Sequence, residues 1–248
     1  MRVSFLVAGV QKAGTTALQA YLAEHPGLQM ASVKEPHVFD DERGMNWDAP
    51  DYGPYHALFG PADGRPRGEA TPIYLYWPPS LDRIARYNPA MRLVLLFRDP
   101  VGRAWSHWRM EMARGWESEP FGWCVREGRA RVDDPAASGA HRVFSYVERG
   151  FYGAQLARAY ALFPRKQVLC LRSDALKARP AETLDRICEF LGAGPFPAPP
   201  RPRELNVGAP SSESGPNDAD ERYLRALFAE DLHRFAALTG LPVEDWLP

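Results

Sequence analysis

Short apolar runs alternate along the chain with segments whose apolar residues recur at helical spacing. Continuous apolar runs predict strands that are buried on both faces, and apolar positions three and four apart predict helices. The predicted strands are residues 3–8, 28–32, 67–70, 92–97 and 167–172. The predicted helices are 15–25, 79–88, 100–113, 151–163, 180–191 and 217–239, with shorter ones near 51–59 and within 114–150. This alternation predicts an α/β fold, in which helices flank a central, mostly parallel sheet.

The composition is that of an ordinary globular protein, with 45% hydrophobic and 25% charged residues among 248. No shift in composition marks a boundary, so we expect a single domain over residues 1–248. The net charge is −1, which gives no overall field to attract nucleic acid. No apolar run reaches the roughly 18 residues of a membrane-spanning helix, and we expect no signal peptide. Three cysteines without a CxxC motif predict reduced thiols, a cytoplasmic location and no metal site.

The first chemical motif is GVQKAGTT, residues 9–16, between the first predicted strand and helix. A glycine-containing turn of this kind presents backbone N–H groups and a helix N-terminus to a phosphate. The spacing resembles a P-loop, GxxxxGK[ST], but Thr15 stands where that motif has its lysine. Lys12 lies inside the loop instead, from where it would reach a bound ligand beside a single phosphate. An ordinary strand-to-helix turn is the alternative interpretation.

The second motif is LVLLFRDPVGRAWSHW, residues 93–108. Arg98 follows the carboxyl end of a predicted strand, where open α/β sheets bind ligands. Ser106 falls on the second turn of the next helix, and an arginine with a hydroxyl there predicts a phosphate clamp. Asp99 fits a helix N-cap followed by proline. It also fits a magnesium-binding acid of a P-loop enzyme, an interpretation we consider less suitable.

Together, the two motifs resemble the nucleotide-binding motifs of the sulfotransferases that use 3′-phosphoadenosine-5′-phosphosulfate (PAPS). The resemblance implies that the first loop holds the 5′-phosphosulfate and that Arg98 and Ser106 hold the 3′-phosphate. Residues carried over to the 5′ side are Lys12, Ala13, Gly14, Thr15 and Thr16. A late basic-glycine signature of many family members is missing, with Arg201 or Arg203 as stand-ins, and Tyr152 is a candidate for stacking on adenine.

The segment KEPHVF, residues 34–39, resembles the part of heparan sulfate N- and 3-O-sulfotransferase domains that carries their catalytic glutamate. This resemblance places Glu35 on that glutamate and extends over most of the chain. It implies an enzyme that moves the sulfuryl group from PAPS to an acceptor hydroxyl by in-line transfer and releases the desulfated nucleotide PAP.

The chemistry of the residues agrees with that assignment. Glu35 can take the acceptor proton as a general base, and Lys12 can neutralise the leaving phosphate oxygen. His37 is a competing base. PAPS needs no second metal-bridged phosphate, so we expect no metal cofactor. A P-loop kinase of a small molecule and a non-catalytic nucleotide-binding protein are the alternative functions.

The acceptor is the least defined part of the prediction. No basic surface for a polyanion is evident, which favours a small or neutral acceptor such as a sugar, a lipid or a secondary metabolite. Aromatic residues in the flanking loops are candidates for its pocket: Trp47, Tyr52, Tyr55, Tyr74, Tyr76 and Trp77. The proline-rich segment 193–216 predicts a lid over the site or, alternatively, a surface tether for the last helix.

Overall fold

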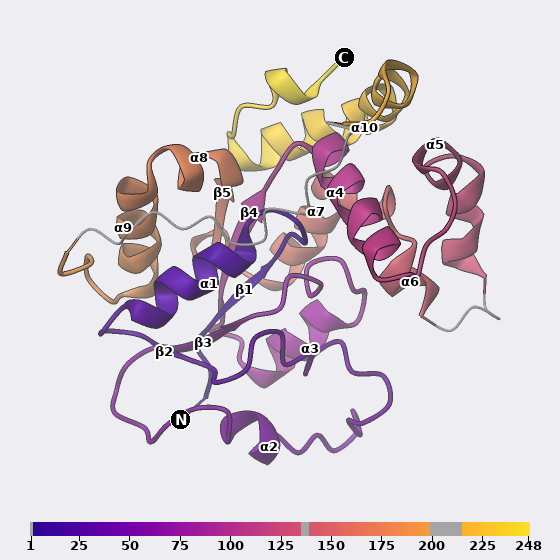
Figure 1. Ribbon diagram of the computed structural model, residues 1–248. Coiled ribbons are helices and arrows are strands. Elements are labelled where there is room, and N and C mark those ends of the chain that lie inside the picture. Colours follow the sequence, from indigo (N-terminus) through magenta and orange to yellow (C-terminus); the bar gives the residue numbers. More distant parts are fainter. Residues whose placement is uncertain (1, 135–138, 199–214) are drawn as a thin grey trace. The chain divides into compact units, whose positions relative to one another are not determined.

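The computed structural model describes residues 2–134, 139–198 and 215–248 (Figure 1). The chain divides into two compact units. The first consists of the described residues of Met1–Phe97 and Arg158–Leu205, and the second of those of Arg98–Ala157 and Asn206–Pro248. The prediction of a single domain over 1–248 stays a prediction.

The first unit contains a five-stranded sheet in the order β2-β3-β1-β4-β5, and every pair of neighbouring strands is parallel. In register, Val7 of the central strand lies beside Ala70 on one side and Val94 on the other. The α/β fold class with a parallel sheet is therefore confirmed. The strands are β1 (Phe5–Gly9), β2 (Gln29–Met30), β3 (Arg67–Ala70), β4 (Arg92–Phe97) and β5 (Val168–Arg172).

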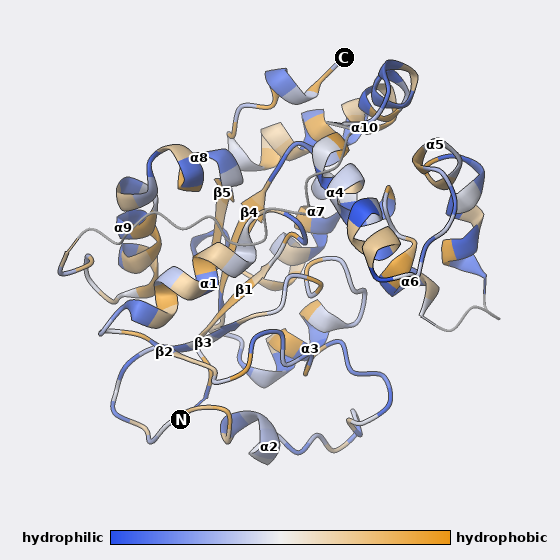
Figure 2. Cartoon of the chain, in the orientation of Figure 1, coloured by the Kyte–Doolittle hydropathy of each residue, from blue (hydrophilic) through white to orange (hydrophobic). Residues whose placement is uncertain are grey.

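Burial explains why the apolar runs became strands. All five residues of β1 are buried, as are the last five of β4, and the hydropathy colouring shows β1, β4 and β5 as mainly hydrophobic (Figure 2). A parallel strand in the middle of a sheet is covered on both faces, which requires such an uninterrupted apolar run. Gly68 of β3 lies against the Phe5 ring, and a Cβ at that position would come within 2.2 Å of it.

Helices complete the first unit, and α1 packs against β1, β2 and β3. The bounds of α1 and α3 agree with the predicted ranges to within one residue, and α9 matches its predicted range, whereas α2 is shorter than predicted and α8 was not predicted. The helix α9 ends where Gly192 adopts a φ of 76°, a conformation that glycine reaches without a steric penalty. The helices are α1 (Thr15–Glu24), α2 (Gly53–His56), α3 (Ser80–Tyr87), α8 (Ser173–Ala178) and α9 (Pro180–Leu191), with a 3₁₀ turn η3 (Arg165–Gln167).

The second unit is helical in its described residues, and α4 packs against α10 and η2 within it. Its core includes the apolar face of α10, where Leu224, Phe228, Leu232 and Phe235 have no exposed surface. Helix α7 (Tyr152–Leu162) begins in this unit and ends in the first. The other elements are α4 (Pro100–Ala113), α5 (Phe121–Cys124), η1 (Glu127–Asp133), α6 (Ala140–Val143), η2 (Glu148–Gly150), α10 (Asp218–Thr239) and η4 (Glu244–Trp246).

Two predictions concern residues outside this description. Most of the proposed lid, 193–216, lies there, as do Arg201 and Arg203. Both stay predictions. Among the helices of the described residues, none is long and apolar enough to cross a membrane.

Candidate active site

The loop that follows β1 has the geometry of an anion-binding turn. The N–H of Val10 continues the sheet by donating to the Leu96 carbonyl at 2.8 Å. The chain then turns through two left-handed residues, Lys12 with a φ of 71° and Gly14 with a φ of 87°. Within the described structure, a Cβ added at Gly14 would have no neighbour within 4 Å, so the loop surface is open at that residue.

Helix α1 begins directly after this loop, with Gly14 as its N-cap. Among the described residues, no side chain caps its first turn, and that turn contains no acidic residue. Free N–H groups and the positive end of the helix dipole favour an anion at this position. Lys12, Gly14 and Thr16 are at least partly exposed, whereas Ala13 and Thr15 are buried, and the N–H of Ala13 donates to the Val10 carbonyl at 3.2 Å.

A second loop, residues 34–42, leaves the same edge of the sheet. The N–H of Glu35 donates to the carbonyl of Ala70, the last residue of β3, at 3.2 Å. Because β3 lies beside β1 and runs parallel to it, the loop with Glu35 and the loop with Lys12 both lie at the carboxyl ends of their strands. Open α/β sheets bind their ligands at this edge.

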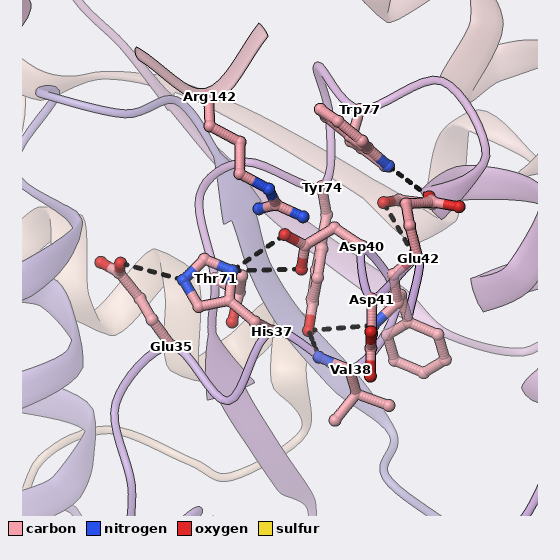
Figure 3. Close-up of polar contacts among 12 residues, drawn as sticks. Glu35, His37, Val38, Asp40, Asp41, Glu42, Thr71, Tyr74, Trp77 and Arg142 are labelled. Atoms are coloured by element: carbon pink, nitrogen blue, oxygen red, sulfur yellow. Dashed lines mark hydrogen bonds and ion pairs between the residues drawn. The ribbon is translucent and has the colours of Figure 1, made fainter. Parts of the chain in front are cut away.

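Glu35, His37 and Asp40 form a chain of contacts within the second loop (Figure 3). His37 Nε2 lies 3.7 Å from Glu35 Oε2, and His37 Nδ1 lies 2.9 and 3.1 Å from the two Asp40 carboxylate oxygens. Lys34 Nζ also contacts Glu35 Oε1. The Asp40 side chain has no exposed surface, whereas those of Glu35 and His37 are 33% and 45% exposed.

These contacts set the charges of Glu35 and His37. Partial burial by itself would raise the pKa of Glu35, but hydrogen bonds and charges from His37 and Lys34 outweigh it and lower the pKa to about 2. Hydrogen bonds to Asp40 and then to Glu35 raise the pKa of His37 to about 9, against the opposing effect of burial. At neutral pH, Glu35 is therefore a carboxylate and His37 an imidazolium.

This charge pattern separates the two candidate bases. An imidazolium carries protons on both ring nitrogens, and in His37 these face Asp40 and Glu35. His37 therefore has no lone pair with which to accept a proton near pH 7. Glu35 is ionised and keeps exposed surface, so it is the group of this pair that can take a proton from a bound hydroxyl.

Sequence reasoning did not find Asp40, nor the buried polar group beneath this loop. Glu69 of β3 is 1% exposed, and it accepts a hydrogen bond from Thr71 Oγ1 at 2.8 Å. Burial raises the pKa of Glu69 to about 7, although hydrogen bonds from Thr71 and Tyr74 favour its carboxylate. Asp40 could have been found in the sequence as an acid three residues after His37. The burial of Glu69 depends on the tertiary fold.

The aromatic residues predicted to line an acceptor pocket divide into two groups. Tyr55 and Tyr74 are 2% and 0% exposed and pack around the buried Phe39 ring, so the prediction that they line a pocket is wrong. They are core residues because the Phe39 ring of the 34–42 loop packs against both of them. The remaining four, Trp47, Tyr52, Tyr76 and Trp77, are partly exposed.

Arg98 and Ser106, the predicted 3′-phosphate residues, belong to the second unit. Asp99, between Arg98 and helix α4, accepts from the N–H groups of Val101 and Gly102 at 3.3 and 2.9 Å. The predicted N-cap at Asp99 is therefore confirmed. Because both of its oxygens face the helix, this acid is occupied in capping.

The guanidinium of Arg98 lies over the first turn of α4. A Cβ built on Gly102 would lie 3.5 Å from Arg98 Nε and Nη2. Gly102 and Ser106 are four residues apart and therefore share one face of the helix. The Arg98 guanidinium thus lies about one helical turn from Ser106, with Gly102 between them.

Tyr152, the candidate for stacking on adenine, is a core residue. Its side chain has no exposed surface, its hydroxyl donates to the Arg98 carbonyl at 2.8 Å, and its ring packs against Phe235 and Trp246. The prediction is wrong because a ring enclosed on all sides offers no face to a ligand. Tyr152 instead fixes the backbone of Arg98.

No cluster of three or more His, Cys, Asp or Glu side chains that could hold a metal ion occurs in ranges 2–134, 139–198 and 215–248. All three cysteines are free thiols: Cys124 and Cys188 are buried and Cys170 is partly buried.

Comparisons with known proteins agree with the geometry. Residues 3–198 match the model of the sulfotransferase domain family. A heparan sulfate glucosamine 3-O-sulfotransferase 6 from Homo sapiens is 31% identical over 191 residues, which are 75% of this chain and 51% of that protein. A bifunctional heparan sulfate N-deacetylase/N-sulfotransferase 2 from Bos taurus is 25% identical over 201 residues, 77% of this chain and 22% of that protein. The chain spans about half the length, or less, of these curated relatives.

A solved structure is similar over its whole length. The sulfotransferase from Alicyclobacillus acidocaldarius superposes with a TM-score of 0.78 at 26% sequence identity, covering 99% of each chain. The resemblance inferred from the motifs of residues 9–16, 34–39 and 93–108 is thereby confirmed at the level of family and fold. The chain belongs to the sulfotransferase domain family.

Proposed function

We propose that this protein transfers the sulfuryl group of PAPS to an acceptor hydroxyl and releases PAP. The observation that carries the proposal is the Glu35 carboxylate, held by the His37 imidazolium at the sheet edge where the anion-binding loop of Lys12 also lies. A base and a phosphate cradle at one edge are what sulfuryl transfer to a hydroxyl requires.

The donor is held by two sets of residues. The N–H groups of the first turn of α1, with Lys12 and Thr16, bind the 5′-phosphosulfate; the open surface at Gly14 lets a ligand approach the backbone closely. Arg98, just before α4, and Ser106 on α4 bind the 3′-phosphate, the arginine through charge-assisted hydrogen bonds. Each set lies within one compact unit.

In the reaction, the acceptor oxygen attacks sulfur in line with the leaving phosphate oxygen. A new O–S bond forms as the S–O bond to the phosphate breaks, and that electron pair remains on the phosphate oxygen of PAP. Glu35 takes the proton of the acceptor hydroxyl, and Lys12 compensates the charge on the leaving oxygen. Holding the reactants in line supplies much of the remaining acceleration.

The donor can be tested without knowing the acceptor. PAP should raise the melting temperature, because it binds the folded state at both phosphate sites, whereas ATP with Mg²⁺ lacks a 3′-phosphate for Arg98. The control is adenosine 5′-phosphate, which lacks the same group. Stabilisation by ATP with Mg²⁺ and none by PAP would favour a kinase, and binding of PAP without turnover of any acceptor would favour a non-catalytic protein.

We further propose that the acceptor is neutral, such as a small alcohol, a sugar or a lipid hydroxyl. The 34–42 loop ends in three consecutive acids, Asp40, Asp41 and Glu42. Glu42 is 42% exposed; it accepts from Trp77 Nε1 at 2.7 Å and pairs with Arg83 at 2.8 Å, which places an aromatic ring beside a paired carboxylate. Aromatic rings stack on sugars, which supports a neutral acceptor such as a glycoside.

A screen of acceptors with PAPS tests this proposal, with PAP release as the readout. Neutral glycosides and alcohols should be turned over, and an N-sulfated glycosaminoglycan should not. Turnover of the polyanion in preference to neutral acceptors would contradict this proposal. It would instead favour a sulfated glycan acceptor, as the names of the relatives suggest.

We also propose that the protein works in a reducing compartment such as the cytoplasm. The three free thiols support this proposal. Fusion of the full-length chain to a fluorescent protein in its source cells tests it directly, and signal outside the cytoplasm would contradict it.

A further inference from the structure

The 34–42 loop is held in a conformation that it would not adopt unaided. Glu35 and His37 both have left-handed backbones, with φ values of 52° and 54°. Residues with a Cβ avoid this region, and two such residues within three persist only where the surroundings fix them. The contacts that fix this loop therefore determine where the carboxylate of Glu35 lies.

Those contacts come mainly from the chain that follows β3. The Ala70 carbonyl accepts from Glu35 N at 3.2 Å, on one side of His37. On the other side, the Tyr74 hydroxyl accepts from the backbone N–H groups of Val38 at 3.0 Å and Phe39 at 3.4 Å (Figure 3). The two anchors thus flank the left-handed turn at His37, and the second of them is a side chain.

Tyr74 is suited to this task by its environment. Its side chain has no exposed surface, and its ring packs edge-on against Phe39 at 5.5 Å between centroids. Burial, and next the nearby charge of Glu69, keep the pKa of Tyr74 well above 10, so its hydroxyl stays neutral. The bond from Phe39 N is buried and the bond from Val38 N is partly buried.

From these contacts we propose that Tyr74 is a positioning residue of the active site: its buried hydroxyl anchors the 34–42 loop and thereby holds Glu35 and His37 in their working geometry. This inference rests on the proposed role of Glu35 as the base. Tyr74 touches no reacting atom and acts through the backbone of Val38 and Phe39. The hydroxyl therefore supports the active site from within the core.

A pair of matched variants tests the proposal. Tyr74→Phe removes only the hydroxyl. Tyr87→Phe removes a second hydroxyl, one that accepts from Val3 N at 2.8 Å and contacts His56 at 2.8 Å, in a ring that also packs on Phe39. Both variants lose hydrogen bonds from one aromatic cluster, but only the Tyr74 hydroxyl bonds to the loop backbone.

In Tyr74→Phe, kcat should fall roughly tenfold or more at saturating substrates, because small displacements of a reacting group are costly. PAP affinity should stay unchanged. The pKa of His37 measured by NMR should fall by about one pH unit, because the loop no longer holds the ring against Asp40. Tyr87→Phe should leave kcat and the His37 titration unchanged, even if it melts at a lower temperature.

Two outcomes would overturn the proposal: wild-type kcat and His37 titration in Tyr74→Phe, or the same losses in Tyr87→Phe. Glu35→Gln provides the reference that separates this proposal from the proposed role of Glu35 as the base. If Glu35→Gln is inactive while Tyr74→Phe is normal, the anchor alone is wrong; if Glu35→Gln is fully active, the assigned base is wrong.

Should Tyr74→Phe fail to fold, amide exchange in the wild-type protein provides an independent test. The N–H groups of Val38 and Phe39 should exchange as slowly as those of the sheet, because both donate to a buried hydroxyl. The N–H of Arg43, which donates to an exposed Asp41 carboxylate, is the internal control and should exchange fast. Fast exchange at Val38 and Phe39 would contradict the anchor.

Discussion

His37 Nδ1 lies 2.9 Å from Oδ2 of Asp40, a carboxylate with no exposed surface. A buried carboxylate is stable only when it is paired, and the imidazolium supplies that pairing. The same ring directs its second nitrogen to Glu35. A core residue thereby determines the charge and orientation of a surface histidine, and through it the environment of the proposed base.

Asp40→Asn should therefore lower the pKa of His37 from about 9 towards its ordinary value of 6.5, because the bonds to Asp40 are the largest contribution to the shift. Two-dimensional NMR of the imidazole rings measures this directly. His56, whose pKa is lowered chiefly by burial, is the control in the same spectra and should not move. An unchanged His37 titration would contradict the assigned geometry.

Stability should decline as pH rises from about 5 to 9. Glu69 has a folded pKa of about 7 against 4.5, so the folded state binds its proton more tightly; its contribution is complete below pH 4.5 and is lost as pH rises through 7. His37 adds a contribution that is complete below pH 6.5 and is lost as pH rises through 9.

Glu69→Gln separates the two parts of this pH dependence. The variant should remove the decline between pH 5 and 7, on the order of 3 kcal/mol in unfolding free energy, and keep the decline above pH 7. Urea unfolding at several pH values measures it. Glu189→Gln, an exposed carboxyl of the same unit, should retain both parts. Equal pH profiles for wild type and Glu69→Gln would refute the buried titration.

Arg98→Ala should raise the Kd for PAP roughly 10- to 100-fold, because a charge-assisted bond to phosphate is lost. Titration calorimetry measures the affinity without any acceptor. Arg114→Ala, at the other end of the same helix and paired with Glu111, is the control for the loss of a charge. If both variants bind PAP equally well, the 3′-phosphate is not held at Arg98.

Lys12→Met should lower kcat by about 10²–10³, because the substitution removes the charge at the leaving oxygen while keeping much of the side chain's length. The comparison is made at saturating PAPS, with Lys166→Met, an exposed lysine of the same unit, as the control. Should Lys12→Met keep its kcat and lose only PAPS affinity, Lys12 binds the donor and takes no part in the chemistry.

Local patterns were sufficient to predict much of this molecule. The strand 92–97 and the helices 100–113 and 180–191 were predicted with their observed bounds, because buried apolar runs, an Asp-Pro start and a glycine end are local signals. The phosphate loop and Glu35 were predicted from short motifs and the resemblance that they carry, and their roles stay predictions.

The missed features depend on contacts between distant segments. Tyr74 falls in a predicted loop and Tyr152 at the start of a predicted helix, and only packing against Phe39 in one case and Phe235 in the other makes them core residues. Glu69 occupies a strand position that the pattern cannot distinguish from an exposed one. The left-handed backbones of Glu35 and His37 also had no signal, because neither is glycine.

The most direct test of the account compares Glu35→Gln with the wild-type protein, using an acceptor identified by the screen. Acceptor-dependent release of PAP from PAPS should fall by about 10²–10⁴ in kcat, while the Kd for PAP stays the same, because the amide keeps the shape of the carboxylate but cannot take a proton. Near-wild-type kcat in Glu35→Gln would contradict the central claim that this carboxylate activates the acceptor hydroxyl.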